Sequence, residues 1–245
     1  SIMLRMTKSG ERSTGASGGL ADPTDERSNC GVGAVIDLDG GQSHETVADG
    51  LELLENLEHR GTTGAEENTG DGAGIKIQRP DDFFDAVVDV DLPAEYAVGS
   101  IFMPQDGAAR EGLVAIFERV LADHDLDVVH WRDVPTDNSE LGATALDSEP
   151  DLRQAFVVPG GDLGADEFAR RAVENEVEAL DSEGAERFYV CSLSRKTLVY
   201  KGLLKGDQLA DYYPDLADER LKTTLTLVHA RFSTNTLGAW HLAHP

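Results

Sequence analysis

Short apolar segments alternate with amphipathic helical segments along this chain. This pattern constrains the fold most, because it restricts the chain to architectures in which helices cover β-sheets. Strands are predicted at residues 32–38, 75–77, 95–103, 187–193, 197–204 and 224–232. Helices are predicted at 46–58, 113–121 and 168–180, and short strands with turns at 127–158. The sequence therefore predicts an α+β fold with sheets layered between helices.

Two further features organise the chain. Ser194-Arg195-Lys196 separates two strands by three residues, which predicts that 187–193 and 197–204 pair as a β-hairpin. Residues 1–29 are rich in Ser, Gly, Thr and charge and lack hydrophobic periodicity, so they are predicted to be a disordered leader. The folded domain is then expected over residues 30–245.

The charge of the chain limits its partners. Asp and Glu number 46 against 21 Lys and Arg, for a net charge of −25, and the acids are spread through every segment. Such a surface repels nucleic acid and anionic membranes, so neither is an expected partner. No apolar run is long enough for a membrane span, and the two cysteines without a disulfide framework favour a cytoplasmic location. The dense carboxylates favour an organism with high internal salt, since salt screens their repulsion.

Cys30 is a candidate nucleophile, at the boundary between the leader and the first strand. The chain has two cysteines and no CxxC pair, so neither a zinc nor an iron–sulfur site is indicated. Gly31 and Gly33 follow Cys30 and permit close approach to it. Removal of the leader would give Cys30 an α-amine with a reference pKa of about 7.7–8.0, able to act as its base. The alternative is an ordinary small buried side chain.

Two arginines lie near the ends of a predicted helix and a predicted strand. Arg60 follows the first predicted helix, where it could simply complement the helix dipole. Arg231 follows a strand and precedes hydroxyls and an amide, which suits bidentate binding of a carboxylate, although a surface loop is the alternative. The loop Gly70–Gly74 lacks the Lys and Ser/Thr of a phosphate-binding P-loop.

Several motifs together resemble the amino-terminal amidotransferase domain of the glutamate synthase large subunit. The four principal ones are Cys30-Gly31-Val32-Gly33, His59-Arg60-Gly61, Thr69-Gly70-Asp71-Gly72-Ala73-Gly74-Ile75 and His229–Thr236. Further matching stretches are Trp131–Thr136, Leu141-Gly142 and Phe188–Arg195. The resemblance extends over residues 30–245. It departs at Leu237-Gly238-Ala239, where the family usually has an aromatic residue and a proline.

The resemblance implies a class II glutamine amidotransferase with the four-layer αββα sandwich of N-terminal nucleophile hydrolases. It implies that Cys30 is the nucleophile, freed by cleavage after Asn29, with Arg60 and Gly31 beside it. Arg231 would bind the α-carboxylate of L-glutamine, with Ser233 and Thr234 lining the pocket. Cys191, within a strand, is expected to be a core residue.

The resemblance also implies how the domain serves a larger enzyme. The family's oxyanion-hole residues are expected beyond Pro245, so the domain is expected to be incomplete and weakly active alone. Ammonia would aminate 2-oxoglutarate in a remainder that holds FMN and an iron–sulfur cluster and receives electrons from a reductant subunit or ferredoxin. Two alternatives remain: another class II amidotransferase, such as a phosphoribosyl or glucosamine-phosphate enzyme, or an inactive interaction module.

Overall fold

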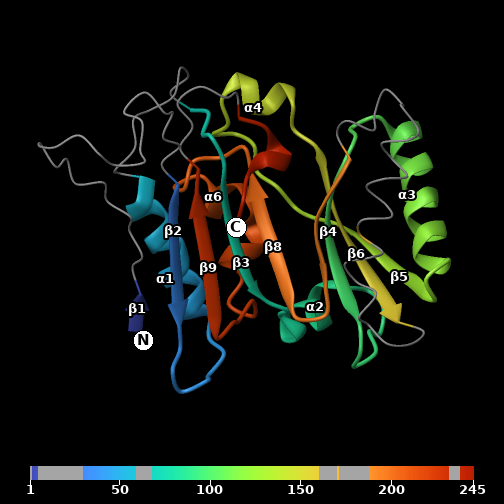
Figure 1. The fold of residues 1–245 in the computed structure, drawn as a ribbon, viewed down its shortest axis with the longest axis horizontal. Helices are drawn as coiled ribbons and strands as arrows, with labels where there is room; N and C mark the ends of the chain where they lie inside the picture. The colour runs from blue at the N-terminus through green and yellow to red at the C-terminus, as the bar shows by residue number, and fades with distance from the viewer. Residues whose placement is uncertain (1, 5–29, 59–67, 160–169, 171–187, 232–237) are drawn as a thin grey trace, which may run out of the picture.

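A computed structural model describes residues 2–4, 30–58, 68–159, 170, 188–231 and 238–245. Within these residues the chain forms two antiparallel sheets with helices around them (Figure 1). The α+β class is therefore confirmed. None of the described helices is long and apolar enough to cross a membrane.

The larger sheet has five strands in the order β1-β2-β9-β3-β8. Its strands are β1 (Ile2–Leu4), β2 (Gly31–Ile36), β9 (Leu225–Ala230), β3 (Ala73–Gln78) and β8 (Thr197–Gly202). The smaller sheet has the order β5-β6-β4-β7, with β5 (Leu126–Asp133), β6 (Asp151–Pro159), β4 (Ala97–Met103) and β7 (Tyr189–Ser194). Each of the six strands predicted by residue range thus has a counterpart, with shifted ends.

The longer helices form where apolar side chains recur on one face. Helix α1 (His44–Glu58) contains the predicted helix 46–58 and buries Val47, Leu54 and Leu57. Helix α3 (Gly107–Ala122) is capped by Asp106, whose carboxylate accepts a hydrogen bond from the Ala109 amide at 2.8 Å. The shorter helical segments are α2 (Asp81–Val87), α4 (Ala143–Asp147), α6 (Leu209–Tyr212), η3 (Pro214–Ala217) and η4 (Trp240–Leu242). The helix predicted at 168–180 lies almost entirely outside the described residues.

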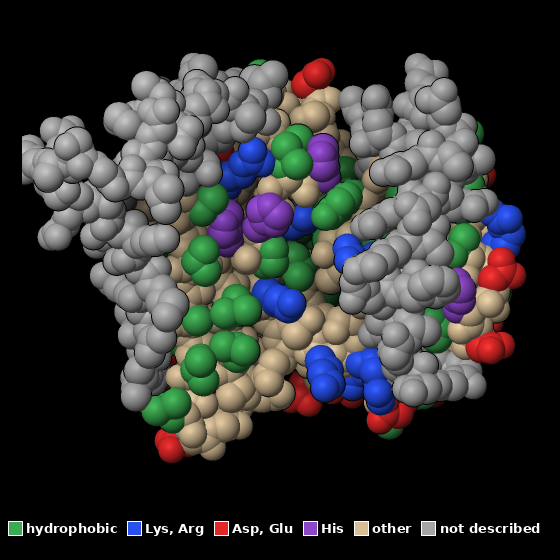
Figure 2. Space-filling model, in the orientation of Figure 1, with side chains coloured by type: hydrophobic (Ala, Val, Ile, Leu, Met, Phe, Trp, Pro, Cys, Tyr) green, Lys and Arg blue, Asp and Glu red, His purple; other side chains and the backbone are tan. Residues whose placement is uncertain are grey.

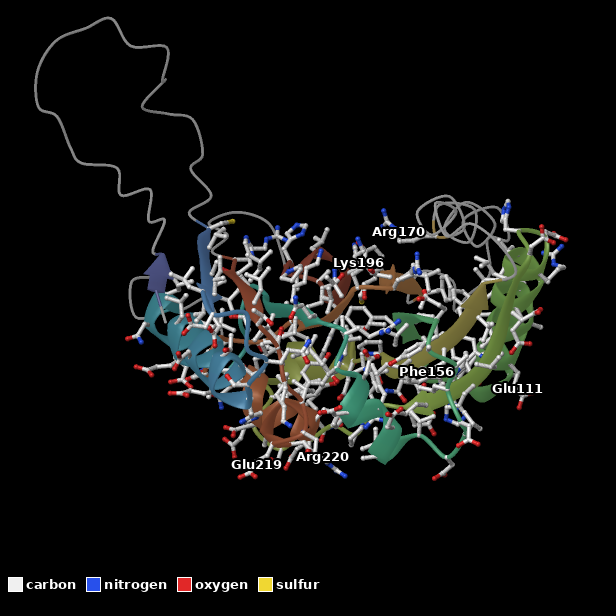
Figure 3. The ribbon with its side chains drawn as sticks, turned by 90° about the horizontal axis from the view of Figure 1, so that it is seen from below. Glu111, Phe156, Arg170, Lys196, Glu219 and Arg220 are labelled. Carbon is white, nitrogen blue, oxygen red and sulfur yellow. The ribbon has the colours of Figure 1, made fainter. Side chains whose placement is uncertain are left out.

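The helices bury different faces of the sheets. Helix α3 packs on one face of the four-stranded sheet, and the opposite face shares a large apolar cluster with the five-stranded sheet and α1. The other face of the five-stranded sheet, termed the front face, carries exposed Val32, Ile36 and Leu227. Figure 3 shows Arg170 and Lys196 on one side of the molecule and Glu219 and Arg220 on the opposite side, with α1 and α6 toward the latter.

The hairpin predicted at Ser194–Lys196 is wrong. Strand β7 pairs with β4 in the four-stranded sheet, whereas β8 pairs with β3 in the five-stranded sheet. The turn itself forms, because the Ser194 hydroxyl accepts hydrogen bonds from the amides of Lys196 and Thr197. A turn signal fixes a local change of direction, but long-range packing decides which strand edges pair. Here the turn carries the chain from one sheet to the other.

The leader also differs in part from the prediction. Ile2–Leu4 forms the edge strand β1, with Leu4 opposite Ala34 of β2. Three apolar residues can extend an open sheet edge even when the sequence around them has no periodicity. Residues 5–29 lie outside the described part of the chain, so the remainder of the predicted leader stays a prediction.

Candidate active site

The register of three neighbouring strands brings the candidate nucleophile and the candidate carboxylate-binding arginine to one edge of the five-stranded sheet. Gly31, the first residue of β2, lies opposite Ala230, the last residue of β9. Ala230 in turn lies opposite Ala73, the first residue of β3. Cys30, Arg231 and Gly72 therefore extend these three strands at the same edge, the upper one in Figure 1.

The backbone at this edge holds Arg231 firmly. The Arg231 amide donates to the Gly72 carbonyl at 2.8 Å, which continues the β9–β3 ladder by one residue. Gly72 has φ of +133°, a conformation that side chains rarely permit, so glycine is needed where the chain turns into β3. The half-buried Arg231 side chain donates from Nη1 to the Leu242 carbonyl at 3.3 Å.

The two cysteines have opposite surroundings. Cys30 is exposed at the start of β2, so its thiol is open to a substrate. Cys191 lies within β7, is partly buried against the main apolar cluster, and burial raises the pKa of its thiol to about 12. Because the thiolate is the nucleophilic form, Cys191 is unsuited to nucleophilic chemistry near neutral pH. Geometry and chemistry both favour Cys30.

The glycines after Cys30 lie where helix α1 packs on β2. A Cβ on Gly33 would lie 2.5 Å from the Leu53 Cδ2 atom, and a Cβ on Gly31 would lie 3.1 Å from the Leu57 Cβ atom. Both glycines therefore allow α1 to pack closely on β2. The predicted close approach of a substrate to Cys30 beside these glycines stays a prediction.

Sequence reasoning gave no role to two ionisable groups on the front face near this edge, His229, which it quoted only as part of a motif, and Lys201. His229, on β9, is 8% exposed, and burial lowers its pKa to about 4. Its Nδ1 atom has no hydrogen-bond partner among the described residues. Lys201, on β8, is 3% exposed. Figure 2 shows His, Lys and Arg side chains gathered over the middle of this face. A lysine within an otherwise apolar strand was the signal that could have identified Lys201.

Three of the predicted site residues, Arg60, Ser233 and Thr234, lie outside the described residues. The last turn of α1 nevertheless approaches the site, since Leu57, three residues before Arg60, contacts Gly31. Among the described residues no group of three or more His, Cys, Asp or Glu side chains could hold a metal ion.

Comparisons with known proteins show which family the chain resembles. The family model of class-II glutamine amidotransferases matches residues 30–245. Glutamate synthase [NADH] of Saccharomyces cerevisiae is 41% identical over 243 residues, covering 93% of this chain and 11% of that protein. The large chain of glutamate synthase [NADPH] of Bacillus subtilis is 38% identical, covering 93% and 15% respectively. Ferredoxin-dependent glutamate synthase 1 of Arabidopsis thaliana is 36% identical, covering 92% and 14%.

Proposed function

Because the chain belongs to the class-II glutamine amidotransferases, we propose that it hydrolyses L-glutamine to glutamate and ammonia with Cys30 as the nucleophile. The observation that carries this proposal is the exposed Cys30 thiol at the start of β2, on the sheet edge that also holds Arg231. A nucleophile and a fixed guanidinium on adjacent strand ends suit a small amino acid, whose carboxylate pairs with the cation.

The reaction needs a base for the thiol, and the Cys30 α-amine supplies it once residues 1–29 have been removed. The amine takes the thiol proton, and the sulfur attacks the side-chain amide carbon of glutamine. The C–N bond then breaks, and the departing ammonia takes that proton while a thioester remains. Water, deprotonated by the same amine, hydrolyses the thioester to glutamate and restores the thiol.

The remaining site residues have supporting roles in this proposal. Arg231 binds the α-carboxylate, and its backbone bond to Gly72 fixes the base of its side chain. Arg60 and the Gly31 backbone position the nucleophile, while Ser233 and Thr234 line the pocket. The Leu57 side chain lies against Gly31, so the last turn of α1 packs beside the start of β2.

We propose that the ammonia is used by another part of a longer protein. The chain spans 11–15% of the length of the three relatives, whose names specify NADH, NADPH or ferredoxin. The use proposed is reductive amination of 2-oxoglutarate in the cytoplasm, with electrons from a reductant subunit or ferredoxin. We propose that FMN and the iron–sulfur cluster belong to that other part, since the chain's two cysteines are fewer than the four thiolates that most such clusters take.

The direct test is labelling of the intact protein with an electrophilic glutamine analogue, followed by peptide mass spectrometry. We expect one label on the peptide containing Cys30, loss of the label in Cys30→Ser, and full labelling in Cys191→Ser. The same spectrum reports whether Cys30 is the first residue of the mature chain. Absence of label at Cys30 would favour an inactive interaction module.

The role of Arg231 is tested separately. We expect Arg231→Ala to raise the glutamine KM about 10- to 100-fold, because the carboxylate loses a charged hydrogen-bonding partner. Arg220→Ala is the control, since Arg220 pairs with Asp218 at the surface. An unchanged KM in Arg231→Ala would assign Arg231 a structural role only.

A further inference from the structure

A short segment near the end of the chain, residues 240–244, lies across the front face at the beginning of β3 and is termed the strap. A Cβ on Gly74 would lie 2.6 Å from the His244 carbonyl oxygen, and a Cβ on Gly72 would lie 3.0 Å from the Ala243 Cβ atom. The Trp240 indole donates to the Ala145 carbonyl at 3.2 Å, which anchors the start of the strap in the core. Figure 1 shows the end of the chain in front of this sheet.

Two cations bind three consecutive carbonyls of the strap. The Lys201 ammonium donates to the carbonyls of His241 at 3.1 Å and Ala243 at 2.8 Å. The carbonyl between them, that of Leu242, accepts from Arg231 Nη1 at 3.3 Å. The strap therefore connects a buried lysine on β8 directly to the proposed carboxylate-binding arginine beyond β9.

Burial of the Lys201 ammonium at this position costs free energy. It is 3% exposed, and no ion pair between it and a carboxylate occurs in the described part of the chain. Its ammonium also lies 4.5 Å from the centre of the Tyr189 ring, a cation–π contact. Burial lowers the pKa of Lys201, as expected of a cation removed from water. An apolar side chain of similar length would avoid this cost, so the carbonyl contacts are what the lysine adds.

We propose that Lys201 is a positioning residue that fixes the strap so that the Leu242 carbonyl orients the Arg231 guanidinium for the substrate carboxylate. This inference rests on the proposed function of Arg231. It follows that loss of Lys201 would weaken recognition of the carboxylate while leaving thioester formation and hydrolysis at Cys30 largely intact.

The first test compares two Lys→Met variants in the intact protein. We expect Lys201→Met to raise the glutamine KM about 10-fold and to change kcat less than about threefold. The reason is that the Arg231 guanidinium, no longer held in position through the strap, binds the carboxylate more weakly, by about the strength of one charge-assisted hydrogen bond. Lys76→Met is the matched control. Lys76 lies two residues from Gly74 on the same face of β3, and among the described residues no hydrogen bond joins it to the strap. An equal change in both variants would overturn the inference.

The second test is a double-mutant cycle with Arg231→Ala. If Lys201 acts through Arg231, Lys201→Met changes KM less than about twofold when Arg231 is already alanine. Independent, multiplicative effects would overturn the inference. A KM unchanged in Arg231→Ala refutes the proposed role of Arg231 itself, whereas a raised KM there with a normal KM in Lys201→Met refutes only the positioning role. If Lys201→Met does not fold, Lys201→Gln takes its place in both tests. Its amide is shorter, uncharged and still a donor, so the same changes are expected at a smaller size, and a KM equal to that of the unmodified protein would overturn the inference.

Discussion

Replacement of Asp215 by alanine is expected to destabilise the fold strongly, because Asp215 is the centre of a buried polar network. Its carboxylate accepts from Arg132 Nη1 at 2.7 Å and Nη2 at 2.8 Å, and from the Tyr200 hydroxyl at 2.9 Å. The side chains of Arg132 and Asp215 are only 10% and 4% exposed. The network joins β5, β8 and η3, and so helps to hold the two sheets together.

The magnitude follows from the charge left behind. In Asp215→Ala the Arg132 guanidinium stays buried. Among the described residues, the acceptor that remains for it is the Gln154 side-chain oxygen, at 2.9 Å. Removing one partner of a buried ion pair costs about 3–5 kcal/mol, because the other charge is left uncompensated. For a chain of this size that corresponds to a fall in Tm of about 10 °C. Urea unfolding followed by circular dichroism measures the change in free energy.

Asp218→Ala is the matched control, three residues away. Asp218 also pairs with an arginine, Arg220, but the two side chains are 23% and 51% exposed. Hydrogen bonding to Arg220 lowers the pKa of Asp218 to about 2, yet solvent screens most of the benefit to stability. We expect the unfolding midpoint of Asp218→Ala to stay near that of the unmodified chain. Similar losses in the two variants would refute the reasoning from burial.

Three further predictions concern backbone space, pH and salt. We expect Gly70→Ala to lower the free energy of unfolding by at least about 1–3 kcal/mol, since its Cβ would lie 2.1 Å from the Leu204 carbonyl oxygen. Gly112→Ala, which has open space on α3, should raise the free energy of unfolding by about 0.5–1 kcal/mol. Urea melts in which both variants shift in the same direction would contradict this. The pKa of His229 is lowered from 6.5 to about 4, so the folded state favours the neutral imidazole. The stability that this preference gives to the fold is fully present above pH 6.5 and is lost as the pH falls toward 4. From pH 7 to pH 5.5, the free energy of unfolding of the unmodified chain should fall by about 1 kcal/mol more than that of His229→Gln, after allowance for screening. Parallel curves of unfolding free energy against pH for the two proteins would contradict this. The net charge of −25 predicts a higher Tm in molar salt than in dilute buffer, and equal melting temperatures would argue against adaptation to high salt.

The local elements could be predicted from the sequence because their signals are local. Apolar spacing predicted the helix at 46–58, and the structure has α1 at His44–Glu58. The predicted strand 197–204 corresponds to β8 at Thr197–Gly202, shorter at its end. The candidate nucleophile and the candidate carboxylate-binding arginine were singled out by motifs whose residues are close in sequence. The strand register then placed Cys30 and Arg231 at one sheet edge.

The tertiary structure decided what depends on residues distant in sequence. The turn at Ser194–Lys196 is visible in the sequence, but its strands enter different sheets because each meets a different free edge. Gly33 packs against Leu53, 20 positions along the chain. Lys201 donates hydrogen bonds to the strap, 40 or more positions along the chain. Short-range periodicity and motifs fix secondary structure and candidate chemistry, whereas pairing and burial depend on which distant surfaces fit together. The sequence by itself thus determined most of the secondary structure and the candidate site residues, and only packing decided which of them meet.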